Sequence, residues 1–233
     1  MKSAVVVFPG SNCEMDTVLA IEKISGRKPE TVWHKDALPQ GTDLVVLPGG
    51  FSYGDYLRVG AIAKVSPVMR SVVEHARAGG LVIGICNGFQ ILLESGLLPG
   101  ALIRNRGLHF VCRWVHLQVE KQGTPFTHFD QRVIRIPIAH ATGNYFIQSD
   151  GLRALEENGQ VLFRYCSESG EVSDASNPNG SLNGIAGITN EQGNVLGMMP
   201  HPERAIDERL GSTDGRLFWE SVLLKHFAAT GAA

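Results

Sequence analysis

The stretch Leu81-Val82-Ile83-Gly84-Ile85-Cys86-Asn87-Gly88-Phe89-Gln90 decides the fold, because it predicts a strand, a tight turn and the start of a helix. Residues 81–85 are a continuous apolar run of the length expected for a strand buried on both faces. Residues 87–94 follow with a helical pattern, and two glycines flank Cys86 in the turn. This context is typical of a nucleophile elbow, where a helix N-terminus favours the thiolate. A buried cysteine in an ordinary turn is the alternative interpretation.

Strand-like and helix-like runs alternate on both sides of this stretch. Such an order predicts an α/β protein with a parallel sheet covered by helices on both faces. Ser11 and Glu14 have the spacing of a capping box, which predicts that the first helix begins there. The expected strands before residue 81 are residues 3–8, 31–34 and 43–47, and the expected helices are residues 11–25 and 66–78.

The second half of the chain departs from this alternation. Residues 108–147 have Val, Trp, Phe and Ile at strand spacing and no clear helix, which predicts an antiparallel segment. Since there is no linker, repeat or low-complexity tract, we expect residues 1–233 to form a single three-layer domain with a mainly parallel central sheet. The remaining expected elements are helices at residues 149–158 and 213–227 and strands at residues 161–165, 184–188 and 194–199.

Composition excludes several classes of protein. The 233 residues are 43% hydrophobic, which suffices for a core without a disulfide or metal staple. With 21 basic and 23 acidic residues, the chain has no basic field for nucleic acid or an anionic membrane. The apolar run at residues 4–8 ends in Pro-Gly and is too short for a signal peptide. The four cysteines form no CxxC pair. We therefore expect a cytoplasmic protein with reduced thiols.

A candidate partner for Cys86 is the segment Pro200-His201-Pro202-Glu203. Pro202 favours an extended conformation at His201. Residues two apart in an extended segment point the same way, with Cα atoms about 6.6 Å apart, so Glu203 can hold the imidazole. Both this segment and Cys86 follow predicted strands, and ligands of open parallel sheets bind at the carboxyl ends of strands. A solvated His-Glu pair in a loop is the alternative, because spacing alone does not show that the two loops meet.

Weaker signals are interpreted more simply. Gly49-Gly50 also follows a strand, and its backbone N–H groups can face a developing oxyanion, although a plain turn explains the pair equally well. Cys112 and His116 are about 13 Å apart if they lie on a strand, too far for one metal ion. His140 is expected to be a core histidine. The sequence therefore predicts no metal site.

These motifs together resemble a known family. Residues 84–90 and His201-x-Glu203 are similar to the triad motifs of class I glutamine amidotransferases. Longer segments resemble, more closely, the PurQ-type family of glutaminase subunits of phosphoribosylformylglycinamidine synthase. Nearly the whole chain is covered, although Ala141-Thr142 replaces the Gly-Glu usual in that family. The matching segments are Phe8-Pro9-Gly10-Ser11-Asn12-Cys13, residues 49–58, Asn177-Pro178-Asn179-Gly180-Ser181 and residues 198–204.

The resemblance implies a flavodoxin-like fold and a role for each matching residue. Cys86 would attack the side-chain amide of glutamine, His201 would transfer protons, and Glu203 would orient His201. The N–H groups of Gly50 and Asn87 would form the oxyanion hole. Gln90, one helical turn after Cys86, would contact bound glutamine, with helix packing as the alternative.

The resemblance also implies partners. The ammonia would pass to a large ATP-dependent synthase subunit of the PurL type, assisted by a small subunit of the PurS type. ATP and Mg would bind to that partner, and no cofactor is expected in this chain, which has no phosphate loop. Two other functions remain open from the residues alone. One is a cysteine hydrolase acting on another substrate, and the other is a non-catalytic module that kept the fold.

Overall fold

The computed structural model describes residues 1–56 and 58–226, which are organised around a nine-stranded sheet in the order β2-β1-β3-β4-β11-β10-β9-β6-β7. A separate two-stranded sheet pairs β5 with β8. The strands are β1 (Ser3–Val7), β2 (Glu30–Trp33), β3 (Leu44–Leu47), β4 (Leu81–Ile85), β5 (Ala101–Ile103), β6 (Val111–Val119), β7 (Val133–His140), β8 (Asn144–Phe146), β9 (Val161–Cys166), β10 (Ile185–Thr189) and β11 (Val195–Met198).

One half of the large sheet is parallel. The pairs β2–β1, β1–β3, β3–β4 and β4–β11 all run in the same direction. This is the strand order of flavodoxin-like folds. Every residue of β3 and β4 is buried, which explains their continuous apolar sequences. The predicted α/β class and flavodoxin-like arrangement are therefore confirmed.

The other half is antiparallel. Strands β11, β10, β9, β6 and β7 pair in alternating directions, and β6 and β7 form a long ladder from Val111 opposite His140 to Gln118 opposite Val133. The antiparallel segment predicted for residues 108–147 is thus present. It extends the same sheet as the parallel strands, so both halves contribute to one continuous layer.

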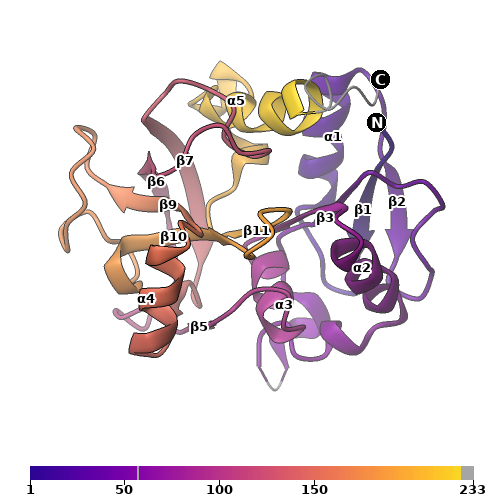
Figure 1. Cartoon of the computed structure of the whole chain (residues 1–233), viewed down its shortest axis with the longest axis horizontal. Coiled ribbons are helices and arrows are strands. Elements are labelled where there is room, and N and C mark those ends of the chain that lie inside the picture. Colours follow the sequence, from indigo (N-terminus) through magenta and orange to yellow (C-terminus); the bar gives the residue numbers. More distant parts are fainter. Residues whose placement is uncertain (57, 227–233) are drawn as a thin grey trace.

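Helices cover the two faces of the sheet (Figure 1). On one face lie α1 and α5, and on the other lie α2, α3 and α4, which confirms the three predicted layers. No helix in the described ranges is long and apolar enough to cross a membrane. The helices are α1 (Glu14–Ser25), α2 (Pro67–Arg77), α3 (Asn87–Glu94), α4 (Ser149–Glu157), α5 (Asp214–Glu220), a π-helical turn (Ser221–Lys225) and the 3₁₀ turns η1 (Ser52–Asp55), η2 (Ala63–Val65), η3 (Leu182–Gly184), η4 (Pro202–Arg204) and η5 (Glu208–Leu210).

Two predicted helix ends need comment. The capping box at Ser11 is wrong, because α1 begins at Glu14 and Cys13 occupies the N-cap position. The hydroxyl of Ser11 instead accepts the backbone N–H of Phe8 at 3.0 Å, which tightens the turn after β1. At the other end of the chain, the predicted helix extends to Phe227, which lies outside the described residues. The division of residues 1–233 into a single domain stays a prediction.

Candidate active site

Cys86 occupies a sharp turn between β4 and α3. Its backbone angles, φ 52° and ψ −103°, lie in a region that residues other than glycine rarely adopt. The cysteine itself therefore makes the turn that the sequence led us to assign to its flanking glycines. Gly88 serves a different purpose, because a Cβ atom there would lie 1.9 Å from the carbonyl oxygen of Leu47. Its missing side chain lets α3 pack directly on β3.

The thiol of Cys86 faces the antiparallel half of the sheet. Cys86 is only 5% exposed. Its S–H donates to the carbonyl oxygen of Ala139, with 3.8 Å between sulfur and oxygen. Ala139 lies near the end of β7, so this strand supplies a wall of the site. No local pattern in the sequence signals this contact, because β7 is the edge strand of the sheet and reaches Cys86 only through the tertiary fold.

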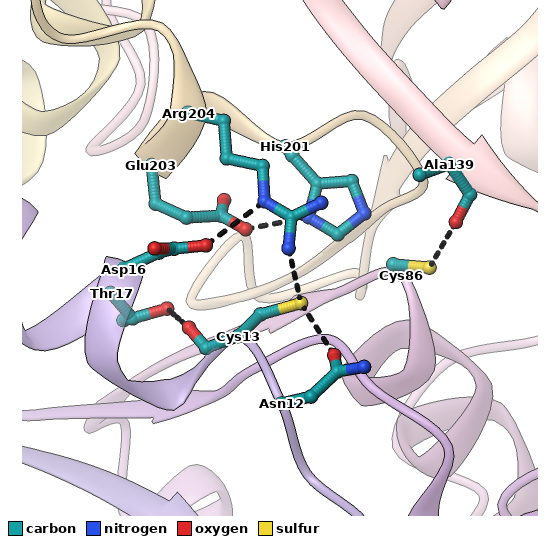
Figure 2. Close-up of polar contacts among 9 residues, drawn as sticks. All are labelled: Asn12, Cys13, Asp16, Thr17, Cys86, Ala139, His201, Glu203 and Arg204. Atoms are coloured by element: carbon teal, nitrogen blue, oxygen red, sulfur yellow. Dashed lines mark hydrogen bonds and ion pairs between the residues drawn. The ribbon is translucent and has the colours of Figure 1, made fainter. Parts of the chain in front are cut away.

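His201 and Glu203 form the buried pair that their spacing predicts. His201 directly precedes the 3₁₀ turn η4, and its backbone N–H is anchored to the carbonyl of Pro137 at 2.8 Å. The ring Nδ1 hydrogen-bonds with Oε1 of Glu203 at 2.6 Å, as Figure 2 shows. The two residues are 1% and 2% exposed, so this is a shielded pair and not a solvated loop contact.

Charges around His201 determine its protonation. Burial alone lowers its pKa, but the Glu203 carboxylate and the sulfur groups of Cys13 and Cys86 raise the pKa of His201 well above its ordinary value. Among the described residues, Nε2 of His201 and Oε2 of Glu203 have no hydrogen-bond partner. The structure thus brings Cys86, His201 and Glu203 into one buried site, with one ring nitrogen available to a bound molecule.

The two residues predicted to donate to an oxyanion lie at the same edge of the sheet. Gly50 follows β3 with φ +145°, and a Cβ atom there would lie 2.8 Å from the backbone nitrogen of Asn12. Asn87 is the first residue of α3. Its side-chain oxygen accepts the N–H of Ser52 at 3.1 Å, which fastens the glycine loop to this helix. Within residues 1–56 and 58–226, the N–H groups of Gly50 and Asn87 have no backbone acceptor.

Gln90 uses both ends of its side chain inside the protein. Its Nε2 donates to the carbonyl of Thr142 at 2.7 Å, and its Oε1 accepts from the side chain of Asn87 at 3.0 Å. The residue therefore links α3 to the connection between β7 and β8, and its predicted contact with glutamine stays a prediction. Thr142 departs from the family pattern, but it makes this contact through its backbone.

His140 is buried at the end of β7, as expected for a core histidine. Its Nδ1 lies 3.1 Å from the side-chain oxygen of Asn105. Burial, followed by the charge of His201, lowers the pKa of His140 to about 4. His140 is therefore uncharged at neutral pH. Its electrostatic coupling to His201 is a feature that the sequence analysis missed, because no pattern in the sequence places these two segments side by side.

Cys13 is a further residue of the site that was assigned no role. In the described part of the chain, the ligand atoms of Cys13, His201 and Glu203 all lie within 4.8 Å of one another. The sulfur of Cys13 also accepts Nη2 of Arg204 at 3.0 Å. The only local signal was its place in a turn before the first helix. Cys112, by contrast, is exposed on β6.

Comparisons with known proteins agree with this geometry. Residues 1–221 match the family described as the CobB/CobQ-like glutamine amidotransferase domain, so the fold and the site define a glutamine amidotransferase. The PurQ subunit of phosphoribosylformylglycinamidine synthase from Nitrobacter winogradskyi is 60% identical over 93% of this chain and 94% of its own length. The PurQ subunit from Moorella thermoacetica is 55% identical over 96% and 95%. The chain therefore belongs to the PurQ family of glutaminase subunits of phosphoribosylformylglycinamidine synthase, as its motifs predicted.

A solved structure leads to the same family. The structure described as PurLQS from Thermotoga maritima contains a chain that superposes with a TM-score of 0.84 and 44% identity, covering 97% of this chain and 98% of that one. The family excludes the two alternatives left open by the residues, a hydrolase for an unrelated substrate and a module without catalytic activity.

Proposed function

We propose that Cys86, His201 and Glu203 form the catalytic triad that hydrolyses glutamine in this chain. The observation that carries the proposal is the buried His201–Glu203 pair beside a cysteine held in an elbow turn. An amide is a poor electrophile, so its cleavage needs a strong nucleophile and an acid for the leaving nitrogen. A thiolate at a helix N-terminus meets the first need, and a protonated imidazole meets the second.

The reaction begins when the Cys86 thiolate attacks the side-chain carbonyl carbon of glutamine. The C–N bond of the tetrahedral intermediate then breaks, and His201 gives its Nε2 proton to the nitrogen, which leaves as ammonia. His201 next takes a proton from water, whose oxygen attacks the glutamyl thioester. Glutamate leaves and the sulfur is free again. Glu203 keeps the imidazole oriented and stabilises its positive charge in both steps.

The negative oxygen of each tetrahedral intermediate needs donors that are already in place. The N–H groups of Gly50 and Asn87 are the proposed donors. Asn87 directly follows Cys86, and Gly49, next to Gly50, lies against the ring of His201. In the described residues, neither N–H has a backbone acceptor. The Asn87–Ser52 hydrogen bond keeps the two donor segments together. Gln90 is proposed to contact the substrate from α3, which requires that it exchange a present partner for glutamine.

The released ammonia is proposed to serve a large synthase subunit of the PurL type, together with a small PurS-type subunit. That partner would bind ATP and Mg and convert formylglycinamide ribonucleotide to formylglycinamidine ribonucleotide, so this chain needs no cofactor. The Thermotoga maritima structure described as PurLQS supports such an assembly. The complex is proposed to work in the cytoplasm.

The test is glutamate release by the purified chain, alone and with the PurL-type and PurS-type subunits, ATP, Mg and the ribonucleotide. We expect weak activity alone and a higher kcat in the mixture, because docking would fix the Gly49-Gly50 loop. The Cys86→Ala chain in the same mixture is the control for glutamine use by other components. Equal rates with and without partners would contradict activation by docking, while no glutamate release in either case would contradict the proposed function.

A further inference from the structure

Cys13 lies at the meeting point of three segments of the site. Its backbone N–H donates to the carbonyl of Gly49 at 3.3 Å, and its sulfur accepts Nη2 of Arg204 at 3.0 Å. It also occupies the N-cap position of α1. The cysteine thereby connects the first helix, the glycine loop that carries the proposed oxyanion donor, and the turn η4 that carries Glu203.

Contacts on both sides fix the position of the sulfur. The S–H donates to the side-chain oxygen of Asn12 at 3.1 Å, while Arg204 approaches from the other side and is itself held by Asp16 at 3.0 Å (Figure 2). Cys13 is only 3% exposed, so water does not compete for these contacts. A buried thiol that both donates and accepts is more constrained than one that only fills space.

The sulfur of Cys13 also lies directly beside the imidazole of His201. A Cβ atom at Gly49 would lie 2.8 Å from Cε1 of His201 and 3.0 Å from the sulfur of Cys13. Both groups therefore occupy the space that a side chain at residue 49 would fill. Cys13 is among the groups that raise the pKa of His201, in addition to Glu203 and Cys86.

We propose that Cys13 is a positioning residue for glutamine hydrolysis, whose sulfur sets the placement of His201 relative to the Gly49-Gly50 loop. The inference rests on the proposed roles of His201 and Gly50. Cys13 is not a second nucleophile in this account, because Cys86 occupies the elbow.

A metal-binding role explains the arrangement of Cys13, His201 and Glu203 less well than a positioning role does. Cys13, His201 and Glu203 offer sulfur, nitrogen and oxygen donors of the kind that Zn²⁺ accepts. However, Nδ1 of His201 is already paired with Glu203, and the guanidinium of Arg204 places a positive charge against the sulfur. A cation would have to displace both contacts. The pattern of partners thus favours a positioning role.

The test compares Cys13→Ala with Cys13→Ser and with the control Cys166→Ala. Cys166 is also buried but lies on β9. We expect Cys13→Ala to lower kcat for glutamine hydrolysis about 10- to 100-fold with little change in KM, because the proton-transfer geometry is lost while the substrate site remains. Cys13→Ser keeps a donor and an acceptor and should recover part of the loss. Thermal unfolding shows whether each variant is folded.

Ring NMR signals of His201, assigned with a His201→Ala spectrum, provide a second measurement. The titratable groups around this ring are Glu203 on η4, Cys13 at α1, Cys86 at α3 and His140 on β7. The titration midpoint of His201 should fall in Cys13→Ala and stay unchanged in Cys166→Ala. If Cys13→Ala does not fold, Arg204→Gln breaks the same contact from its other end and should lower kcat in the same way.

The outcomes separate this inference from the proposed function. A kcat of Cys13→Ala within about twofold of Cys166→Ala, with an unchanged His201 midpoint, would overturn the positioning role while leaving the triad intact. Full activity of Cys86→Ala would instead overturn the triad. Loss of wild-type activity on treatment with a chelator, restored by adding Zn²⁺, would assign the cluster to a metal ion and overturn our inference.

Discussion

The parallel and antiparallel halves of the sheet contribute to the site in different ways. The parallel half carries the nucleophile candidate at the end of β4 and places His201 just beyond β11. The antiparallel half supplies surroundings: the Ala139 carbonyl against the thiol, the Pro137 carbonyl that anchors His201, and the buried His140. The candidate catalytic residues thus follow strands of the parallel half, while residues of the antiparallel half surround and anchor them. The following predictions test whether this division holds.

Replacing the nucleophile in the parallel half should have the largest effect. We expect Cys86→Ala to lower glutamine hydrolysis at least about 10⁴-fold, because no other thiol occupies the elbow. Cys166→Ala, in the antiparallel half, should keep near-normal activity. Glutamate release measured on both folded variants checks this prediction. Substantial activity in Cys86→Ala would place the nucleophile elsewhere.

His201→Ala should cost more activity than Glu203→Gln. His201 moves protons, whereas Glu203 orients the ring and stabilises its charge across a 2.6 Å contact. We expect a loss of at least about 10³-fold for His201→Ala and a smaller loss for Glu203→Gln. The kcat values of both variants are the measurement. Equal losses, or a larger loss for Glu203→Gln, would show that the two roles are wrongly assigned.

How well the sequence predicts the molecule also differs between the halves. Residues 81–85 and 87–94 were predicted with the bounds that β4 and α3 have, because an apolar strand and a helical repeat are local signals. The contact of Cys86 with Ala139 depends on the placement of distant strands and has no local signal. The positive φ of Cys86 was likewise missed, since the sequence suggested that glycine would make the turn.

Replacing one buried glycine in each half by alanine should show how tightly that half is packed. In Gly88→Ala the new Cβ would lie 1.9 Å from the carbonyl oxygen of Leu47, so the backbone of a fully buried strand residue would have to shift. In Gly187→Ala, on β10, the new Cβ would lie 3.0 Å from Cβ of Met198 and from Cδ2 of Phe163, a much milder overlap.

We expect Gly88→Ala to lower the free energy of unfolding by more than about 3 kcal/mol and Gly187→Ala by about 1 kcal/mol. Urea denaturation followed by circular dichroism measures both. A similar cost for the two substitutions would mean that the β3–α3 contact is not the tighter of the two.

Buried His140, at the end of β7 in the antiparallel half, should make the free energy of unfolding depend on pH. The pKa of His140 is about 4 in the folded protein and near 6.5 in the unfolded chain. As the pH falls, the unfolded chain therefore binds a proton at a higher pH than the folded protein does. The resulting stability is complete above pH 6.5 and is lost as the pH falls towards 4, by about 3 kcal/mol in total.

His140→Asn keeps a polar partner for Asn105 but does not titrate. We therefore expect the unfolding free energy of the wild type, relative to this variant, to decrease between pH 7 and pH 4. Urea titrations of both proteins across this range provide the measurement. A difference that does not change with pH would show that His140 is not held uncharged.

The most direct test of the central claim is to trap the nucleophile with a diazoketone analogue of glutamine, which alkylates the attacking thiol as dinitrogen leaves. Peptide mapping by mass spectrometry then locates the adduct, and glutamine is added as competitor. We predict a single adduct on Cys86, formed in proportion to the loss of glutaminase activity and slowed by glutamine. An adduct on Cys13 or Cys112 that accounts for the inactivation, or labelling of Cys86 without loss of activity, would contradict the account.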